Sequence, residues 1–82
     1  LWATPLQDRV TGTVTSKEDG QPLPGVSIVI VGTSIGTTTD LNGKYTISVA
    51  NGQTLQFSSI GYAAQSVVYS GQNPLDLVMD VD

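Results

Sequence analysis

One segment constrains the fold of this chain more than any other, residues 23–45 with the sequence LPGVSIVIVGTSIGTTTDLNGKY. It holds an apolar run rich in β-branched residues, a Gly-Thr corner, a Thr-rich stretch and an Asn-Gly turn. β-Branched side chains fit the pleated surface of a sheet, and Asn-Gly suits the positive φ angles of tight hairpin turns. The segment therefore predicts two strands and a turn of a compact antiparallel β-sandwich.

Seven short strands are predicted along the chain from apolar residues that alternate or run together between turn residues. They cover about residues 9–15, 26–31, 36–39, 44–49, 55–59, 61–69 and 75–80. Turn signals at a spacing of roughly 8–12 residues are typical of a sandwich rather than of a parallel α/β sheet. The predicted fold class is therefore all-β, a sandwich of seven strands.

The apolar faces of these strands identify the expected core. We expect its main residues to be Tyr45, Ile47, Val49, Leu55 and Phe57. The run 26–31 is apolar almost throughout, which predicts a central strand that is covered for much of both faces. The last strand is expected to present Asp76 and Asp80 on a solvent-exposed outer face.

Length and charge limit what this chain can do. Its 82 residues are enough for one domain, and we assign 1–8 as a flexible lead-in, 9–80 as the domain and 81–82 as the start of a linker. The net charge is −4, so nucleic acid is not an expected partner, because phosphates require a basic patch. No apolar run is long enough to span a bilayer, so we expect no direct membrane insertion by this domain.

Nothing in the sequence indicates a catalytic site, and we predict that the domain is not an enzyme. The chain has no Cys and no His, which removes thiolate nucleophiles and imidazole bases. Ser58 and Ser59 therefore lack a base and are better explained as polar strand residues. The remaining acids are expected to be solvated surface groups: Glu18, Asp19, Asp76, Asp80 and Asp82. We expect no catalytic residue, no cofactor and no metal site.

Two loop signals resemble known motifs and fail on spacing. Asp40-Leu41-Asn42-Gly43 resembles the start of a calcium loop, but Tyr45 stands where Gly is required and Asn51 where a bidentate Glu belongs. A turn is the favoured interpretation, and a weak calcium site at Asp40 is the less favoured alternative. Gly43-Lys44 resembles the end of a phosphate-binding loop, but the required earlier Gly is replaced by Thr38 and a strand follows instead of a helix.

Aromatic side chains offer one further kind of site. Flat rings on a sandwich can stack on sugar rings, and the candidates here are Trp2, Tyr62 and Tyr69. Tyr45 and Phe57 fall on predicted core faces instead. A glycan-binding surface is therefore an alternative hypothesis, less favoured than a structural or protein-interaction role.

A series of short motifs occurs in order along most of the chain. They are V-x-G-x-V at 10–14, P-L-P-G-V at 22–26, G-T-x-x-G-T-x-T-D at 32–40, N-G-x-Y at 42–45, L-x-F-S at 55–58 and I-G-Y at 60–62. The series resembles the carboxypeptidase-regulatory-like domain, over about residues 9–80. It is most similar to the copy at the N-terminus of SusC/RagA-like TonB-dependent outer-membrane transporters of Gram-negative bacteria.

The resemblance implies a transthyretin/prealbumin-like, Greek-key β-sandwich with no catalytic residues to carry over. It implies a position at the periplasmic face of the outer membrane, with the plug and barrel of the parent chain downstream. The implied function is that of an accessory interaction domain, which contacts a TonB-type energy-transducing protein or other periplasmic partners. The alternatives are a glycan-binding module, or a structural spacer domain of another secreted or surface protein.

An interaction role requires a surface that a partner can use. Sandwiches have edge strands with unpaired backbone groups, and such an edge can accept a strand from another chain. We expect the edge to lie at one of the terminal strands, near Val10 or near Leu77.

Overall fold

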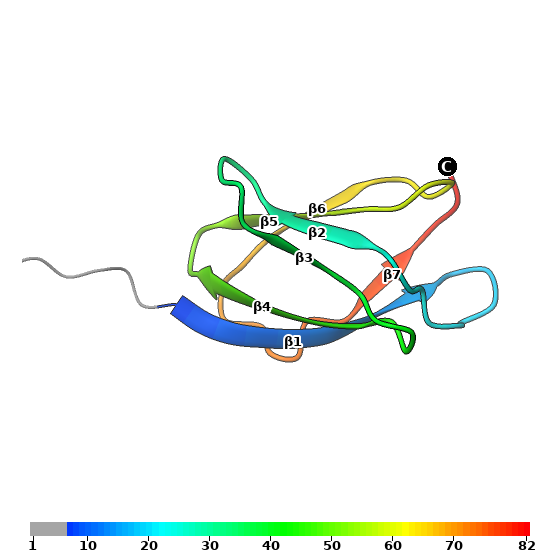
Figure 1. Cartoon of the computed structure of the whole chain (residues 1–82), viewed down its shortest axis with the longest axis horizontal. Helices are drawn as coiled ribbons and strands as arrows, with labels where there is room; N and C mark the ends of the chain where they lie inside the picture. The colour runs from blue at the N-terminus through cyan, green and yellow to red at the C-terminus, as the bar shows by residue number, and fades with distance from the viewer. Residues whose placement is uncertain (1–6) are drawn as a thin grey trace, which may run out of the picture.

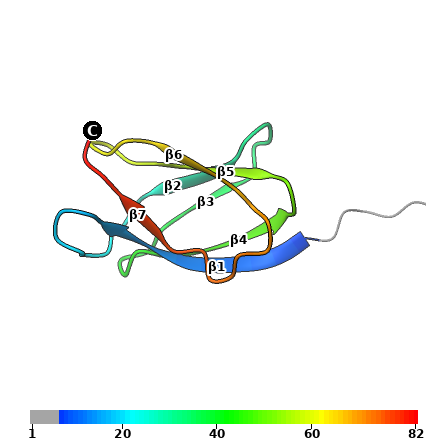
Figure 2. The ribbon, with the colours of Figure 1, turned by 180° about the vertical axis from the view of Figure 1, so that it is seen from behind.

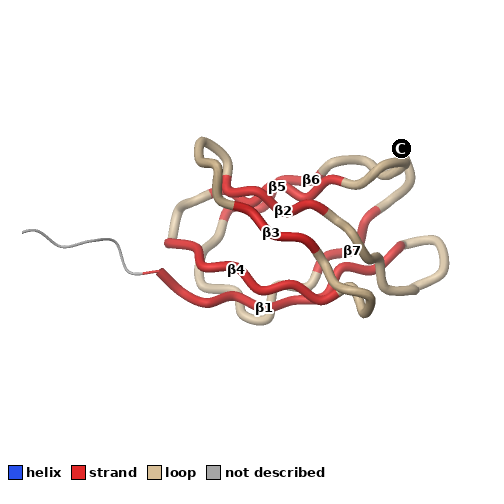
Figure 3. Tube along the Cα trace, in the orientation of Figure 1, coloured by secondary structure: helices blue, strands red, loops and turns tan. Residues whose placement is uncertain are grey.

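The computed structural model describes residues 7–82 as seven β-strands in two facing sheets, joined by turns and loops (Figures 1 and 3). The strands are β1 (Gln7–Ser16), β2 (Ser27–Ile30), β3 (Gly36–Thr38), β4 (Lys44–Ala50), β5 (Thr54–Ser58), β6 (Gln65–Val68) and β7 (Leu77–Met79). One sheet has the order β4-β1-β7 and the other β3-β2-β5-β6. The predicted seven-stranded β-sandwich is confirmed, and the Greek-key connectivity stays a prediction.

Strand β1 is the centre of the three-stranded sheet and changes partner along its length. Residues 7–13 pair antiparallel with β4, and residues 14–16 pair in parallel with β7. The strand begins two residues earlier than predicted, because Gln7 and Asp8 pair with Ala50 and Val49. The assignment of residues 7 and 8 to a flexible lead-in is therefore wrong, and residues 1–6 lie outside the part that the structure describes.

Strand β2 is a central strand of the four-stranded sheet, between β3 and β5. Only one of its faces is fully covered: Ile28 and Ile30 are completely buried, whereas Val31, directly after the strand, is 54% exposed. The expectation that much of both faces would be covered holds within β2, whose outward residues Ser27 and Val29 are partly covered, and it fails at Val31. A sandwich of two layers covers one face of each sheet, and no third layer covers the outer face of β2.

The core lies between the two sheets and contains the expected residues. Tyr45, Ile47, Val49, Leu55 and Phe57 are all buried, together with Val10 and Val14 of β1. The rings of Tyr45 and Phe57 meet edge to face, with centroids 5.6 Å apart and an interplanar angle of 76°. This arrangement is favourable for aromatic pairs and links β4 of one sheet to β5 of the other.

Two glycines allow close backbone approaches that a side chain would block. A Cβ atom on Gly12 would lie 1.9 Å from the carbonyl oxygen of Leu75, because the segment before β7 crosses β1 at this point. Gly43 has a φ of +72°, as its place in the Asn-Gly turn predicts, and a Cβ atom there would lie 2.6 Å from the Val14 oxygen. Both residues therefore fix the path of the chain next to β1.

The last two strands are shorter than predicted. β6 covers only the end of the predicted 61–69 strand, and β7 only the middle of 75–80. The alternation predicted for the last strand holds, with Leu75 and Met79 buried and the acidic residues between and after them exposed. Residues 7–82 contain no helix of the length and apolarity that a membrane crossing requires.

Candidate interaction surface

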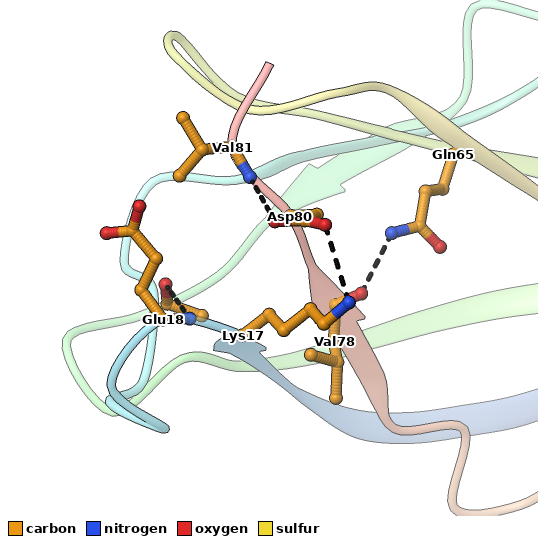
Figure 4. A network of polar contacts seen from close by, with 7 residues as sticks. Lys17, Glu18, Gln65, Val78, Asp80 and Val81 are labelled. Carbon is orange, nitrogen blue, oxygen red and sulfur yellow. Dashed lines mark hydrogen bonds and ion pairs between the residues drawn. The ribbon is translucent and has the colours of Figure 1, made fainter.

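The acidic side chains lie on the surface, and several serve as backbone caps. Asp19 Oδ1 accepts the Gln21 N–H at 3.0 Å, and Asp76 Oδ1 accepts the Thr13 N–H at 2.9 Å. Asp80 pairs with Lys17 at 3.6 Å between two side chains that are 59% and 68% exposed (Figure 4). A pair this exposed contributes little to stability. These carboxylates therefore have structural tasks and are exposed to solvent.

The Asp40 loop has the geometry of a turn. The Oδ1 atom of Asp40 accepts the N–H groups of Asn42 and Lys44, at 2.8 and 3.0 Å. The backbone closes the same turn, since the Asp40 N–H donates to Lys44 O and the Gly43 N–H to Asp40 O. Among residues 7–82, no three or more carboxylates gather as a metal site would need. The turn interpretation therefore accounts for this motif.

The tyrosines proposed for sugar stacking do not form a platform. Tyr69 is only 1% exposed, and its hydroxyl donates to Asp8 Oδ2 at 2.6 Å, so its expected role as an exposed ring is wrong. This hydrogen bond, followed by burial, raises the pKa of Tyr69. Tyr62 is partly buried against the core, with its hydroxyl 3.4 Å from Ser16 Oγ. Trp2 lies outside the described residues.

Tyr69 turns inward because the β5–β6 pairing continues past β6. The Tyr69 N–H donates to Gln53 O, and the Gly52 N–H donates to Tyr69 O. Alternation from Val67 then places the Tyr69 side chain on the core face. A sequence signal for this existed, since residues 67 and 69 share a face of the predicted strand.

The residues that resembled parts of catalytic or phosphate-binding motifs, Ser58, Ser59 and Gly43, lie at the end of a strand and in turns. Ser58 is an exposed residue at the end of β5, opposite Ser27 of β2. The Ser59 carbonyl accepts the Tyr62 N–H in the turn that follows. Gly43 ends the turn before β4, so Lys44 begins a strand as predicted and not a phosphate-binding helix.

The edge expected near Val10 does not exist, because β1 has a neighbour on each side. β7 is an edge strand of its sheet, as expected near Leu77, but its outer side is covered. Val78 O accepts Gln65 Nε2 at 2.8 Å (Figure 4). Asp80 O accepts the Ala63 N–H at 2.9 Å. A bridge between Tyr62 and Val81 lies next to them, so the two sheets are joined on the β6–β7 side.

Side chains also cover the part of β1 that β7 does not reach. The Asn73 amide accepts the Thr11 N–H at 3.3 Å and donates to Arg9 O at 3.0 Å, so it takes the place of a neighbouring strand. Figure 2 shows this segment, before β7, running beside β1. On β6, the outward-facing Val68 O accepts Gln72 Nε2 at 3.3 Å.

The opposite side of the sandwich, between β3 and β4, has free backbone edges; we call it the open side. β4 bonds to β1 through alternate residues, as the bond from Val14 N to Gly43 O shows, so Thr46 and Ser48 direct N–H and C=O groups outward. Asp40 caps Lys44 at one end of this window, and Gln53 Oε1 accepts the Ala50 N–H at the other. The window of Thr46 and Ser48 is therefore short and bounded.

The open side also leaves an apolar residue of the inner face partly uncovered. Ile35 pairs with Ile30, since the Ile30 N–H donates to Ile35 O at 2.9 Å, and the two side chains share the inner face. Ile30 is completely buried, whereas Ile35 is 48% exposed. β3 and β4 belong to different sheets, and no backbone pairing joins them. The open side therefore combines unpaired backbone groups with exposed apolar surface.

Known proteins with similar sequences place this architecture in a family. The family model of the CarboxypepD_reg-like domain matches residues 10–81. TonB-dependent receptor P3 of Formosa agariphila is 43% identical over 77 residues, which cover 93% of this chain and 8% of that protein. TonB-dependent receptor SusC of Bacteroides thetaiotaomicron is 33% identical over 63 residues, which cover 77% of this chain and 6% of that protein. The chain thus spans less than a tenth of the length of these relatives.

Solved structures support the fold. A chain of the Coh3ScaB-XDoc_M1ScaA complex, a type II cohesin-X-dockerin complex from Acetivibrio cellulolyticus, superposes with a TM-score of 0.69 at 22% identity. The match covers 89% of this chain and 57% of that chain, and at this identity it shows the β-sandwich fold alone. The motif series, the two-sheet architecture and the family match over 10–81 agree, and the chain belongs to the CarboxypepD_reg-like domain family.

Proposed function

We propose that this chain is a non-catalytic interaction domain of a SusC/RagA-like TonB-dependent outer-membrane transporter, located on the periplasmic side of the membrane. The observation that carries the proposal is the 43% identity to a TonB-dependent receptor over 93% of the chain. Because the matched region is only 8% of that receptor, the domain is a small module of a longer polypeptide in that relative. Its partners are then the plug and barrel of the parent chain and a periplasmic protein of the TonB type.

The surface chemistry supports a binding role without catalysis. Asp19, Asp40 and Asp76 use carboxylate oxygens to cap backbone groups, and Asp80 pairs with Lys17. The open side, in contrast, offers hydrogen-bonding groups and apolar surface to another molecule. Contact with a partner protein uses both features directly, as in strand addition to a sheet edge.

A titration tests direct contact with the energy-transducing machinery. The isotope-labelled domain is mixed with the periplasmic domain of TonB from the same organism, and amide resonances are followed. We expect concentration-dependent shifts on one continuous surface. If no resonance moves at about millimolar partner, where even weak complexes form, direct coupling to TonB is wrong.

Deletion from the parent receptor tests the accessory role itself. Removing residues 7–82 should reduce nutrient uptake while the barrel still assembles in the outer membrane, as measured by surface labelling. Normal uptake after deletion would contradict an accessory role in transport. Loss of barrel assembly would instead support the structural-spacer alternative. The glycan alternative is weakened because Tyr69 is buried.

A further inference from the structure

We propose that the outer edge of β4 accepts an extended segment of a partner protein as an additional antiparallel strand. The segment alternates apolar and polar residues and carries basic residues at its flanks. This inference rests on the proposed interaction role and deepens it, because it names the edge that is used and the chemistry of the segment that binds.

The backbone of β4 is arranged to receive such a strand. Residues 45 and 47 direct their backbone groups toward β1, so the four groups of Thr46 and Ser48 face away from the sheet. Both side chains are exposed, small and uncharged, so they leave the edge accessible. Caps by Asp40 and Gln53 close the window at its ends and limit the pairing to these two residues.

The outer edges of β1 and β7 are covered, and β6 is capped at one of its outward groups, the Val68 carbonyl. Asn73 and Asp76 cover β1, Gln72 covers the outward Val68 carbonyl of β6, and Gln65 covers β7. Proteins protect edge strands in such ways because an uncovered edge pairs with other chains. β3 also lacks caps at Gly36 and Thr38, but it has only three residues against seven in β4. The longer strand is therefore the better template.

The inner side of the added strand sets its apolar positions. A strand paired with β4 extends the three-stranded sheet over the uncovered inner face next to β3, where Ile35 is 48% exposed. Side chains that face inward from the added strand then contact Ile35 and the rim of the core at Ile47. Covering these groups removes apolar surface from water, which favours apolar residues at alternate positions of the bound segment.

Net charge and area decide between a partner segment and a second copy of this chain. The chain carries a net charge of −4, which attracts basic segments and repels another copy of itself. Edge pairing over two residues also buries far less than the roughly 1,200 Å² that a stable protein–protein interface needs. A flexible segment that pairs with the β4 edge and also contacts Ile35 is the occupant that fits.

Proline variants test the edge without breaking the sheet. Ser48→Pro removes an outward N–H and places a ring on the edge, while the bonds of residues 47 and 49 to β1 remain. The matched control is Ser66→Pro, because Ser66 holds the same outward position on β6, next to the Gln72 cap. The probe is the capped octapeptide KTITVTIK, and the control peptide is KTITPTIK, in which a central proline prevents strand pairing.

We expect the first peptide to shift the amide resonances of Thr46 and Ser48 and to slow their hydrogen exchange, with a Kd of about 1 mM. Ser48→Pro should weaken binding by about tenfold, and Ser66→Pro should leave it unchanged. Shifts centred on β6, a self-associated domain in sedimentation, or equal binding of both peptides would each overturn the proposal. If Ser48→Pro does not fold, Ile35→Lys replaces it, because a charge at the inner rim should also weaken binding.

The parent receptor separates this inference from the proposed function. If deletion of residues 7–82 reduces uptake and Ser48→Pro in the full receptor also reduces it, both stand. If deletion reduces uptake but Ser48→Pro does not, the interaction role stands and the β4 edge is the wrong site. Normal uptake after deletion would refute the role, whatever the peptide does.

Discussion

The two long sides of this sandwich are built differently. On the β6–β7 side, the sheets are joined by the hydrogen bonds of Gln65 to Val78 and of Ala63 to Asp80, and this is the closed side. On the β3–β4 side, no strand pairing joins the sheets, and Thr46 and Ser48 direct backbone groups to solvent. The difference shows that side chains and backbone bonds cover the outer edges of β1 and β7, whereas Thr46 and Ser48 of β4 have no such cover.

The two sheets also differ in the number of charged residues that they contain. Strands β2, β3, β5 and β6 contain no charged residue, so the four-stranded sheet is neutral along its whole width. All ten charges of the chain lie in β1, β4, the turns and the segments around β7. The open side therefore lies where a neutral sheet meets a charged one, and Lys44 is the one charged residue of β4.

The largest expected effect is at Gly12, where the segment before β7 crosses β1. Gly12→Ala places a methyl group 1.9 Å from Leu75 O and 2.8 Å from the Tyr45 ring, both of which are held by other contacts. The segment before β7 must move away, so we expect a loss of about 3 kcal/mol or more in the free energy of unfolding, at the upper end of overpacking effects. Chemical denaturation measures it.

Gly36→Ala is the matched control on the open side. Its Cβ atom would lie 2.8 Å from Ile28 O and 3.4 Å from the Val29 side chain, at an edge strand that has room to shift outward. We expect a loss of less than half that of Gly12→Ala. Equal losses would show that the two sides resist displacement equally, which would contradict the proposed difference between them.

The turn that leads into β4 gives the second effect. Gly43→Val combines a positive φ of +72° with a Cβ atom 2.6 Å from Val14 O, so we expect destabilisation by more than about 1 kcal/mol. Gly52→Val is the control, because its φ is +88° but a Cβ atom there meets nothing within 4 Å. The difference between the two melting temperatures then reports the close contacts of Gly43 with Val14, Pro22 and Leu23.

Much of this fold could be predicted from the sequence, because alternation is a local property. The core positions in β4 and β5 and the Asn42-Gly43 turn follow from period two and from turn chemistry, and the structure confirms them. The order of the strands could not be predicted in the same way. β1 is central because residues 73–76, more than sixty positions away in the chain, return to cover it, and no local pattern encodes that contact.

The sequence predicted that the candidate surface would be a strand edge, but it did not predict which strand provides that edge. An edge strand was expected at Val10 or Leu77, but β1 is internal and the outer side of β7 is bonded to residues 61–65. Burial of Tyr69 and exposure of Val31 were missed for related reasons. A strand's length and the number of layers over it depend on distant segments, whereas apolar runs report only local preference.

The third prediction concerns the hydroxyl of Tyr45 in β4, which donates to the Leu75 carbonyl before β7 in the buried interior. Tyr45→Phe leaves that carbonyl without its partner, and we expect a loss of about 1–2 kcal/mol at neutral pH. The pKa of Tyr45 is raised above its ordinary value of 10.0, by burial and then by the charge of Asp76. The neutral form is thus favoured in the folded state.

The pH dependence follows from that direction. Between the unfolded and the folded pKa, the unfolded chain has released the Tyr45 proton and the folded chain has not, so stability falls as pH rises above about 10. Tyr69, also raised, adds a loss of the same sign. Tyr45→Phe should show a shallower decline than the unchanged protein. An identical decline in alkaline denaturation curves would contradict the assignment of this loss to Tyr45.

The smallest expected effect sharpens the comparison most directly, because it removes the side-chain cap from the β7 edge while the Ala63–Asp80 bond remains. Gln65→Ala removes the bond to Val78 O at the surface, where the carbonyl can bind water instead, so we expect a loss of at most about 1 kcal/mol. Gln65→Glu is the control, because it keeps the side-chain length and removes the donor. In both variants the β7 edge should gain the ability to bind the alternating peptide, seen as new shifts at Val78. If no resonance at Val78 shifts when the peptide is added, the Gln65 cap is not what protects the β7 edge. The absence of caps on β4 would then no longer indicate a docking edge.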